Sequence, residues 1–371
     1  MAKTYLALIC GGKSVEHEVS LVSAKNIIAA LDLTKYELLL FAVAKDGTFR
    51  FYSDYQHFLA HDDDPDLISL KKTGFTEVAW SVADGVGQAI LPTGNQKIDV
   101  VFPIMHGSFA EDGKMQGFLE MLNLPYVGPD VLASAIAMDK EITKKLAIMS
   151  AIKVAKYLSF EQTTRQAIDF KQVAQVLGLP FFVKPASAGS SVGINKVNNQ
   201  EQFHRALEAA FAVDHKILIE TAISGRELEC AVLGNREELI VGEVGEIIPN
   251  AKHGFYSYDA KYLDEAGAQL LIPAPLLPAQ QQAIQALSKK IFRICQAEGM
   301  ARVDFFLSDS GEIFFNEINT IPGFTKISMY PKLMMQATGM TYGRLIDHLI
   351  NLAIARHSRN SKIRFEKKMI E

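Results

Sequence analysis

The chain has 371 residues, of which 49% are hydrophobic and 22% are charged, and its formal net charge is −4. This composition is ordinary for a globular protein of two or three domains, and it gives no electrostatic basis for nucleic acid as the main partner. No apolar run reaches membrane-spanning length, and the start of the chain does not read as a signal peptide. We therefore expect a cytoplasmic protein without a membrane or nucleic-acid partner.

The three cysteines are widely spaced and odd in number: Cys10, Cys230 and Cys295. Such a set favours neither a disulfide framework nor a zinc site. Cys10 ends an apolar strand, so we expect it to be a small buried residue.

The first part of the chain has the pattern of an α/β unit. Strands are predicted at 5–10, 38–44 and 98–104, and helical patterns at 19–31 and 117–122. Gly11 and Gly12 follow the first strand, but the full Gly-x-Gly-x-x-Gly fingerprint of a dinucleotide-binding fold is absent.

Two polar loops follow strands of this unit. Ligands of open α/β sheets bind beyond the carboxyl ends of the strands, which places Glu16 and His106 at the mouth of a site. A lone acid in a loop is more often simply solvated, and the glycine-bounded loop at 106–113 is a weak signal alone. Two such loops together favour a ligand.

Prolines at 125–129 indicate a boundary, after which a helix is predicted over 134–149. Lysines on a helix usually form a solvated face, so Lys144 alone carries little weight. The segment 181–185 reads as a strand that ends in Lys184-Pro185, and the loop after it is small, hydroxyl-rich and contains glycine. Backbone N–H groups of such a loop can surround phosphate oxygens, with Lys184 as a fixed cation, although an ordinary flexible hairpin has the same pattern.

Another strand, 216–220, ends in Glu220 and precedes Glu227. An acid and free backbone groups at this place can bind an adenine edge and ribose hydroxyls, although acids at strand ends are common for other reasons. The long polar segment 253–267 contains Lys261 and Tyr262, and loops of this length are often lids.

The segment 301–325 predicts a β-hairpin whose turn is 308–311. We place Leu307 opposite Glu312, which puts Arg302 opposite Glu317 and makes Asp304 the diagonal neighbour of Glu317. Residues 313 and 315 are then on the face of Glu317. Two carboxylates, with Asn319 beside them, suit Mg²⁺, whereas the alternative is a solvated acidic face.

Several motifs in this order resemble the D-alanine–D-alanine ligases of the ATP-grasp superfamily, from Leu8 to about Leu349. The motifs are GGKSVEHEVS at 11–20, HGSFAEDG at 106–113, GSSVG at 189–193, AKY at 260–262 and NTIPGFT at 319–325. In the second motif, Ala110 stands where many relatives have glycine, but no charged group is lost.

The resemblance implies an α/β, in part α+β, fold with three domains. An N-terminal Rossmann-like (pre-ATP-grasp) domain would span 1–130. A central ATP-grasp subdomain would span 131–218 and carry the phosphate flap, the loop at 186–193. A C-terminal ATP-grasp subdomain with the metal site and lid would span 219–371.

The resemblance also implies a reaction. ATP phosphorylates the carboxylate of a first D-alanine, and the amine of a second D-alanine then displaces phosphate to form D-alanyl-D-alanine for peptidoglycan synthesis. The implied cofactors are ATP, as a substrate, and two Mg²⁺ or Mn²⁺ ions. A homodimer is expected by resemblance only.

Roles for individual residues follow from the matched motifs. The catalytic set would be Glu16, Ser190, Tyr262, Arg302 and Gly323. The substrate-binding set would be His106, Ser328 and Met329. The ATP-binding set would be Lys144, Lys184, Ser191, Glu220, Ala222, Ile223, Glu227 and Lys261. The metal ligands would be Asp304, Glu317 and Asn319.

Within these sets, Glu16 would hold the first substrate's ammonium group and form a hydrogen-bonded triad with Ser190 and Tyr262. Arg302 and the Gly323 N–H would stabilise the oxyanion, the kind of preorganised electrostatics that dominates acyl chemistry.

Three alternatives remain open from the sequence. The nearest is a related ligase that uses D-lactate or D-serine as the second substrate. Relatives that make D-alanyl-D-lactate lack the Ala-Lys-Tyr pattern around Tyr262, which favours the dipeptide. A nucleotide-binding regulatory module without catalysis is disfavoured by the retained charged set. An oxidoreductase with a Rossmann fold lacks its glycine fingerprint.

Overall fold

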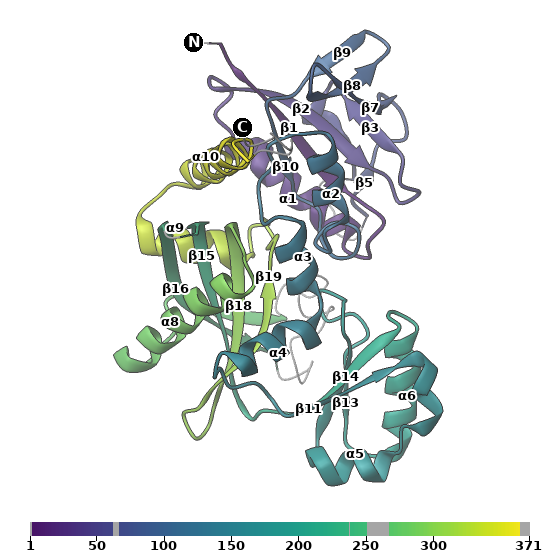
Figure 1. The fold of residues 1–371 in the computed structure, drawn as a ribbon, viewed down its shortest axis with the longest axis vertical. Coiled ribbons are helices and arrows are strands. Elements are labelled where there is room, and N and C mark those ends of the chain that lie inside the picture. Colours follow the sequence, from purple (N-terminus) through teal and green to yellow (C-terminus); the bar gives the residue numbers. More distant parts are fainter. Residues whose placement is uncertain (1, 62–66, 237, 251–266, 364–371) are drawn as a thin grey trace, which may run out of the picture.

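The computed structural model describes residues 2–61, 67–236, 238–250 and 267–363 (Figure 1). Lys261, Tyr262 and nearly all of the expected lid at 253–267 lie outside these residues. The described part is a mixed α/β structure, as predicted, and it has three main sheets.

The N-terminal domain is built on a five-stranded sheet of order β10-β1-β2-β3-β6, in which β1 pairs in parallel with β10 and β2. Its strands are β1 (Thr4–Gly11), β2 (Tyr36–Val43), β3 (Phe49–Tyr52), β6 (Thr76–Glu77) and β10 (Val100–Pro103). Its helices are α1 (His17–Ala30) and α2 (Lys114–Met121). The smaller elements are η1 (Tyr55–His57), β4 (Leu59–Ala60), β5 (Ser69–Leu70), β7 (Ala79–Ala83), β8 (Val86–Leu91) and β9 (Gly94–Lys97).

The central domain is an antiparallel four-stranded sheet of order β11-β14-β12-β13, with α5 and α6 packed against it (Figure 1). Phe181, Val183, Ile217 and Ile219 alternate along two strands and bury one face against Phe203 of α6. The elements are β11 (Tyr157–Glu161), η2 (Gln162–Ala167), α5 (Phe170–Leu177), β12 (Phe181–Pro185), β13 (Asn195–Val197), α6 (Gln200–Phe211) and β14 (Lys216–Thr221).

The single helix predicted over 134–149 is wrong, because the structure has two helices there. They are α3 (Val131–Met138) and α4 (Lys140–Met149). Asp139 has an extended backbone between them, and its carboxylate accepts hydrogen bonds from the N–H groups of Glu141 and Ile142. An aspartate in this position is a strong N-cap, so it begins a new helix.

The C-terminal domain is an antiparallel sheet of order β17-β16-β15-β18-β19 between two helices. Cys230 packs toward α8 and Ala231 packs toward α9, so the sheet is covered on both faces. The elements are β15 (Gly225–Asn235), β16 (Glu238–Pro249), β17 (Ala268–Leu271), α8 (Pro278–Ile294), β18 (Gly299–Ser308), β19 (Ile313–Asn319), α9 (Met329–Thr338) and α10 (Tyr342–Asn360).

The hairpin is present, but its predicted register is wrong. Leu307 pairs with Ile313, Asp304 pairs with Glu317, and Arg302 pairs with Asn319. The register shifts beside Asp304, so that Asn316 is an extra residue in β19, as in a β-bulge.

The bulge also makes the prediction that Phe315 and Glu317 share one face of the hairpin wrong. Phe315 pairs with Phe305 and is buried with it in the core, and Ile313 packs against the same core. Glu317 lies on the opposite face, with Asp304. A regular strand would have placed Phe315 and Glu317 on one face, as the sequence predicted.

Helix α10 packs on the N-terminal domain and lies beside β1 and β10 in Figure 1. Its Leu345 and Leu349 share a core with Leu6 and Leu8 of β1. Arg356 of the same helix donates hydrogen bonds to the carbonyls of Tyr126 and Gly128. The C-terminal helix therefore packs against the N-terminal domain. The domain boundaries expected from the sequence stay a prediction.

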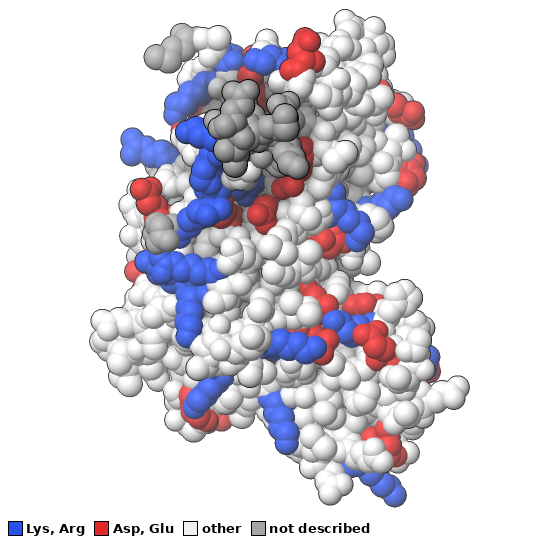
Figure 2. All heavy atoms as spheres, in the orientation of Figure 1, with Lys and Arg blue, Asp and Glu red and all other residues white. Residues whose placement is uncertain are grey.

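The helices, the surface charges and the cysteines can be compared with what the composition led us to expect. Among the described residues, none of the helices is long and apolar enough to cross a membrane. On the face shown in Figure 2, basic and acidic side chains are interspersed. Cys10 is fully buried, as expected, and Cys230 and Cys295 are buried thiols as well.

Candidate active site

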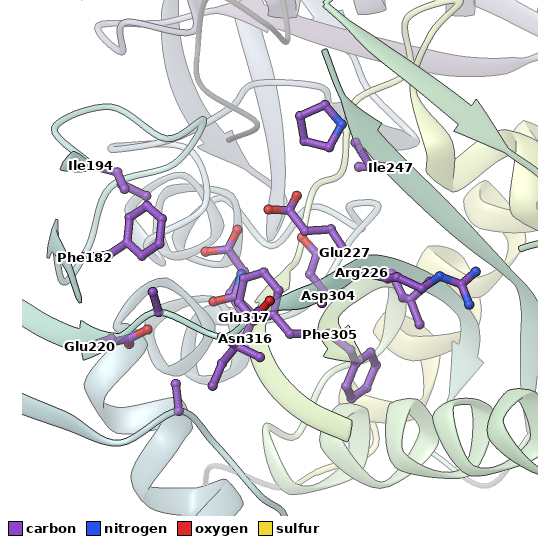
Figure 3. A pocket seen from close by; sticks show the side chains of 18 of the residues that line it. Phe182, Ile194, Glu220, Arg226, Glu227, Ile247, Asp304, Phe305, Asn316 and Glu317 are labelled. Atoms are coloured by element: carbon purple, nitrogen blue, oxygen red, sulfur yellow. The ribbon is translucent and has the colours of Figure 1, made fainter. Parts of the chain in front are cut away.

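A cavity of about 720 Å³ lies between the central and C-terminal sheets. Figure 3 shows Phe182 and Ile194 on one wall and Asn316, Glu317 and Asp304 opposite them. The lining includes six of the eight residues expected to bind ATP or its phosphates: Lys184, Ser191, Glu220, Ala222, Ile223 and Glu227. Residues far apart in the sequence therefore meet in one nucleotide-sized space.

Two lysines converge on one carboxylate at the floor of this cavity. The Lys184 ammonium lies 2.5 Å from Glu220 Oε2, and the Lys144 ammonium lies 3.1 Å from Glu220 Oε1. Burial lowers the pKa of Lys144 to about 8, against the attraction of Glu220. Burial alone would raise the pKa of Glu220, but the two ammonium groups hold it below its usual value. A triphosphate bound in this cavity could contact two buried ammonium groups.

The bulge residue Asn316 holds both ammonium groups in place. Its backbone carbonyl lies 3.2 Å from Lys144 Nζ, and its side-chain oxygen lies 3.3 Å from Lys184 Nζ. The irregularity that turns Glu317 toward the cavity thus also orients the two lysines.

Lys140 was not given a role by the sequence analysis, yet it is buried at the same site. Its ammonium lies 3.2 Å from Glu317 Oε2 and donates to the carbonyl of Ala188 at 2.7 Å. The N-cap signal of Asp139, one residue earlier, marks the helix start that directs Lys140 inward. Lys140 connects the flap to the acidic hairpin.

The three residues that the sequence analysis expected to hold a metal, Asp304, Glu317 and Asn319, lie on β18 and β19. Asp304 and Glu317 are direct cross-strand partners that line the large cavity, so their side chains share one face. Among the described residues, no cluster of three or more His, Cys, Asp or Glu side chains could hold a metal alone. Two carboxylates and an amide oxygen fit Mg²⁺, which normally takes its remaining ligands from substrate phosphates and water.

Arg302 is held against two acids. Its Nε and Nη2 donate to the two oxygens of Asp304 at 2.8 Å each, and Nε lies 3.0 Å from Glu229 Oε2. Burial opposes the charge, but Asp304 and Glu229 hold the pKa of Arg302 well above its usual value. Glu229 pairs with Asp304 across β15 and β18, a contact that the sequence analysis missed.

A second cavity of about 80 Å³ adjoins the first. Both are lined by Glu229 and Glu317. The smaller cavity collects eight of the remaining expected site residues, Glu16, His106, Ser190, Arg302, Gly323, Asn319, Ser328 and Met329. A small amino acid placed there would lie next to the nucleotide cavity.

The flap closes over this smaller cavity. Ser190 donates a hydrogen bond to Glu16, which joins the flap to the N-terminal domain. Ser190 and Ser191 both have positive φ angles, 49° and 60°, which bend the loop sharply. The third member of the expected triad, Tyr262, lies outside the described residues, as does Lys261.

His106 is a neutral, buried ring with two partners. Its Nδ1 lies 3.0 Å from the carbonyl of Ile321, and its Nε2 lies 3.3 Å from Ser23 Oγ. Burial lowers the pKa of His106 to about 4. The contact with a backbone carbonyl makes Nδ1 the protonated nitrogen.

Glu111 was also missed by the sequence analysis. Its two carboxylate oxygens accept from the N–H groups of Gly107 at 2.8 Å and Ile321 at 3.0 Å. Burial, together with the charge of Glu16, raises the pKa of Glu111 above its usual value. Its partner Ile321 is distant in the sequence, so only the motif around 106–113 could have marked it.

Two family models match the chain, described as "D-ala D-ala ligase N-terminus" over residues 5–129 and "D-ala D-ala ligase C-terminus" over residues 146–351. The chain belongs to the D-alanine–D-alanine ligase family. Among curated relatives of this family, the D-alanine–D-alanine ligase of Oceanobacillus iheyensis is 48% identical, over 98% of each chain.

Solved structures of D-alanine–D-alanine ligases and their relatives share the fold. The Coxiella burnetii enzyme superposes with a TM-score of 0.84 at 35% identity, over 98% of this chain and 97% of its own. The VanG D-Ala:D-Ser ligase of Enterococcus faecalis gives a TM-score of 0.82 at 34% identity, over 95% and 100%. The ATP-grasp ligase fold predicted from the motifs is confirmed. The same fold carries two second substrates in these two relatives.

Proposed function

We propose that the enzyme joins two D-alanines to D-alanyl-D-alanine, using ATP and Mg²⁺ or Mn²⁺, and so supplies peptidoglycan synthesis. Family membership supports the activity. The observation that carries the site assignment is the adjacency of the two cavities, which share Glu229 and Glu317. A nucleotide in the larger one and a small substrate in the smaller one would bring the phosphoryl group and the carboxylate together.

In the first step, a carboxylate oxygen of the first D-alanine attacks the γ-phosphorus of ATP. A new P–O bond forms, the bond to the β-phosphate oxygen breaks, and ADP leaves. Lys144 and Lys184 would neutralise phosphate charge, while Glu220 keeps the two lysines close together. Mg²⁺ held by Asp304, Glu317 and Asn319 would neutralise charge on the transferred group. Positioning and electrostatics carry such a transfer.

In the second step, the amine of the second D-alanine attacks the acyl carbon. The C–N bond forms, the amine gives up a proton to solvent, and the C–O bond then breaks as phosphate leaves. Negative charge develops on the carbonyl oxygen, where Arg302 and the Gly323 N–H would stabilise it. Arg302 Nη1 makes none of the hydrogen bonds among the described residues, so it can serve this oxygen.

Glu16 would bind the first ammonium group, and Ser190 links that carboxylate to the flap. We assign Tyr262 to the same triad and Lys261 to the phosphates from the motif alone. Ser328 and Met329, which line the smaller cavity, would contact the second substrate. Ser328 Oγ already accepts from the N–H of Thr325 at 2.9 Å, so its position is fixed.

We also propose that the enzyme is cytoplasmic, since the proposed substrates ATP and D-alanine would be supplied in the cytoplasm. A homodimer is proposed from the resemblance to the family alone. Light scattering of the purified enzyme tests the oligomeric state.

The activity is tested by incubating the enzyme with ATP and Mg²⁺ and identifying products by mass spectrometry. We expect dipeptide from D-alanine alone and no product from L-alanine. With D-serine or D-lactate added, D-alanyl-D-alanine should remain the main product. A dominant mixed dipeptide or ester would assign the enzyme to one of the alternative ligase branches.

A further inference from the structure

The segment 321–324 follows β19 and carries Gly323. Both polar backbone groups of Ile321 are bound by the loop at 106–111 of the N-terminal domain. Its N–H donates to Glu111 Oε1 at 3.0 Å, and its carbonyl accepts from His106 Nδ1 at 3.0 Å. Two side chains therefore fix the orientation of the chain where it enters this segment.

Phe324, at the other end of the segment, is bound by helix α1. Its N–H donates to Ser23 Oγ at 3.2 Å, and its carbonyl accepts from Asn26 Nδ2 at 3.1 Å. Tyr342 donates to the same carbonyl at 2.8 Å. Ser23 also contacts His106, so the two ends of the segment are held by one connected network.

Between these ends, one N–H is left for a ligand. Pro322 has none, and the Gly323 N–H makes none of the hydrogen bonds found within the described residues. Gly323 lines the smaller cavity, beside Arg302. A Cβ at this position would lie 2.7 Å from Ser328 Oγ, so any other residue here would displace that hydroxyl group.

We propose that Ser23 and Glu111 are positioning residues that, through the backbone of Ile321 and Phe324, fix the Gly323 N–H at the reacting carboxyl group. The inference rests on the proposed function, because it assigns a support to the oxyanion donor of that reaction. An oxyanion donor is effective only if its position is fixed before the charge develops. The N-terminal domain thus sets the geometry of a catalytic group that belongs to the C-terminal domain.

Glu111 suits this task because both of its oxygens are used. One accepts from Gly107 in its own loop, and the other accepts from Ile321. A glutamine at this position can accept on one side only, and its amino group would face an N–H donor on the other. Replacement by glutamine should therefore release Ile321 or distort the loop that holds it.

Ser23 provides a test with a closely matched control. Ser20 lies one turn earlier on α1 and is equally buried. Among the described residues its hydroxyl bonds within the N-terminal domain, to Gly11 N at 2.7 Å and Ile104 O at 2.5 Å. We expect Ser23→Ala to lower kcat about 10-fold and to leave KM for ATP unchanged. Losing an oxyanion donor altogether costs roughly 10²-fold or more in kcat, and this variant should only misplace the donor. Ser20→Ala should lower the melting temperature at least as much and keep kcat.

Glu111 has a control in the next residue. Asp112 accepts from Phe109 N at 2.9 Å and Lys114 N at 3.2 Å, both within its own loop and helix. We expect Glu111→Gln to lower kcat about 10- to 100-fold, whereas Asp112→Asn should change it by less than about threefold. The comparison separates support of Ile321 from simple folding of the loop.

A binding measurement distinguishes positioning from a purely structural role. A phosphinate analogue of the dipeptide mimics the tetrahedral intermediate, so it should bind Ser23→Ala and Glu111→Gln more weakly by the same factor as kcat falls. Nucleotide affinity, measured by calorimetry, should stay within about twofold of wild type. Unchanged kcat in both variants, or equal losses in the Ser20 and Asp112 controls, would overturn the inference. Wild-type enzyme that makes no dipeptide would instead refute the proposed function.

Discussion

Asp304 and Glu317 face each other directly across β18 and β19 because Asn316 forms a bulge one residue before Glu317. Without the bulge, the pairing of Leu307 with Ile313 would have continued to place Glu317 against Val303, on the buried face of Phe315. The bulge instead brings the two carboxylates together at the large cavity and leaves Arg302 paired with Asn319. One extra residue thus separates the proposed metal site from the proposed oxyanion site.

The direct pairing predicts that Glu317 is needed for divalent-cation binding. We expect Glu317→Gln to raise the Mg²⁺ concentration for half-maximal activity at least 10-fold and to weaken Mn²⁺ binding measured by electron paramagnetic resonance, because one of two anionic ligands is lost. Glu312→Gln is the control, since Glu312 is on the same hairpin but pairs with the exposed Lys153. Equal Mn²⁺ affinity in wild type and Glu317→Gln would contradict the assignment.

The lysine pair predicts a large stability effect at Glu220. Glu220→Gln removes the acid between two buried ammonium groups, Lys144 and Lys184. Breaking such a buried pair on one side costs about 3–5 kcal/mol in the free energy of unfolding. Urea titrations at pH 7 measure this change. A loss below about 1 kcal/mol would show that the ammonium groups are solvated and do not depend on Glu220.

The buried ring of His106 predicts a specific pH dependence of stability. Its pKa is lowered from 6.5 to about 4 in the folded protein, so the unfolded chain binds the extra proton first as pH falls. The free energy of unfolding should therefore decrease from pH 6.5 down to pH 4, by up to about 3 kcal/mol from this residue. In His106→Asn this part of the slope should disappear, as urea titrations of both proteins at several pH values can measure. If the free energy of unfolding had the same pH dependence in both proteins, the pKa of His106 would not be lowered by folding.

The two-acid environment of Arg302 predicts that lysine cannot replace it. A single ammonium group cannot bond both oxygens of Asp304 and also reach a developing oxyanion. We expect Arg302→Lys to lower kcat about 10²–10³-fold. Arg236→Lys, in the pair with Glu298 at the surface, should leave kcat unchanged in the same phosphate-release assay. Activity retained in Arg302→Lys would mean that its charge alone is sufficient.

The sequence predicted local elements and separate motifs well. The strand at 181–185, with Lys184 at its end, matches β12 residue for residue. Glu16 and His106 were placed together from the rule for strand ends, and both line the smaller cavity. These inferences needed only periodicity and the rule that ligands bind beyond strand ends.

Other features depend on contacts that periodicity does not contain. The bulge at Asn316 breaks the strand alternation without a glycine or proline to mark it. Ser23 and Glu111 bind the backbone N–H groups of residues more than 200 positions away in the sequence. Such a bond leaves no sequence signal, because almost any residue type has a backbone N–H. Lys140 looked like one of several surface lysines until the N-cap at Asp139 set the start of its helix.

The central claim is that the carboxylate of the first D-alanine is phosphorylated before the peptide bond forms. D-Alanine labelled with ¹⁸O in its carboxylate, with ATP and Mg²⁺, tests this directly. The account predicts D-alanyl-D-alanine as the product and one ¹⁸O atom transferred to each phosphate released, because the C–O bond of the acyl phosphate breaks. Phosphate without ¹⁸O, released while dipeptide forms, would contradict the acyl phosphate route.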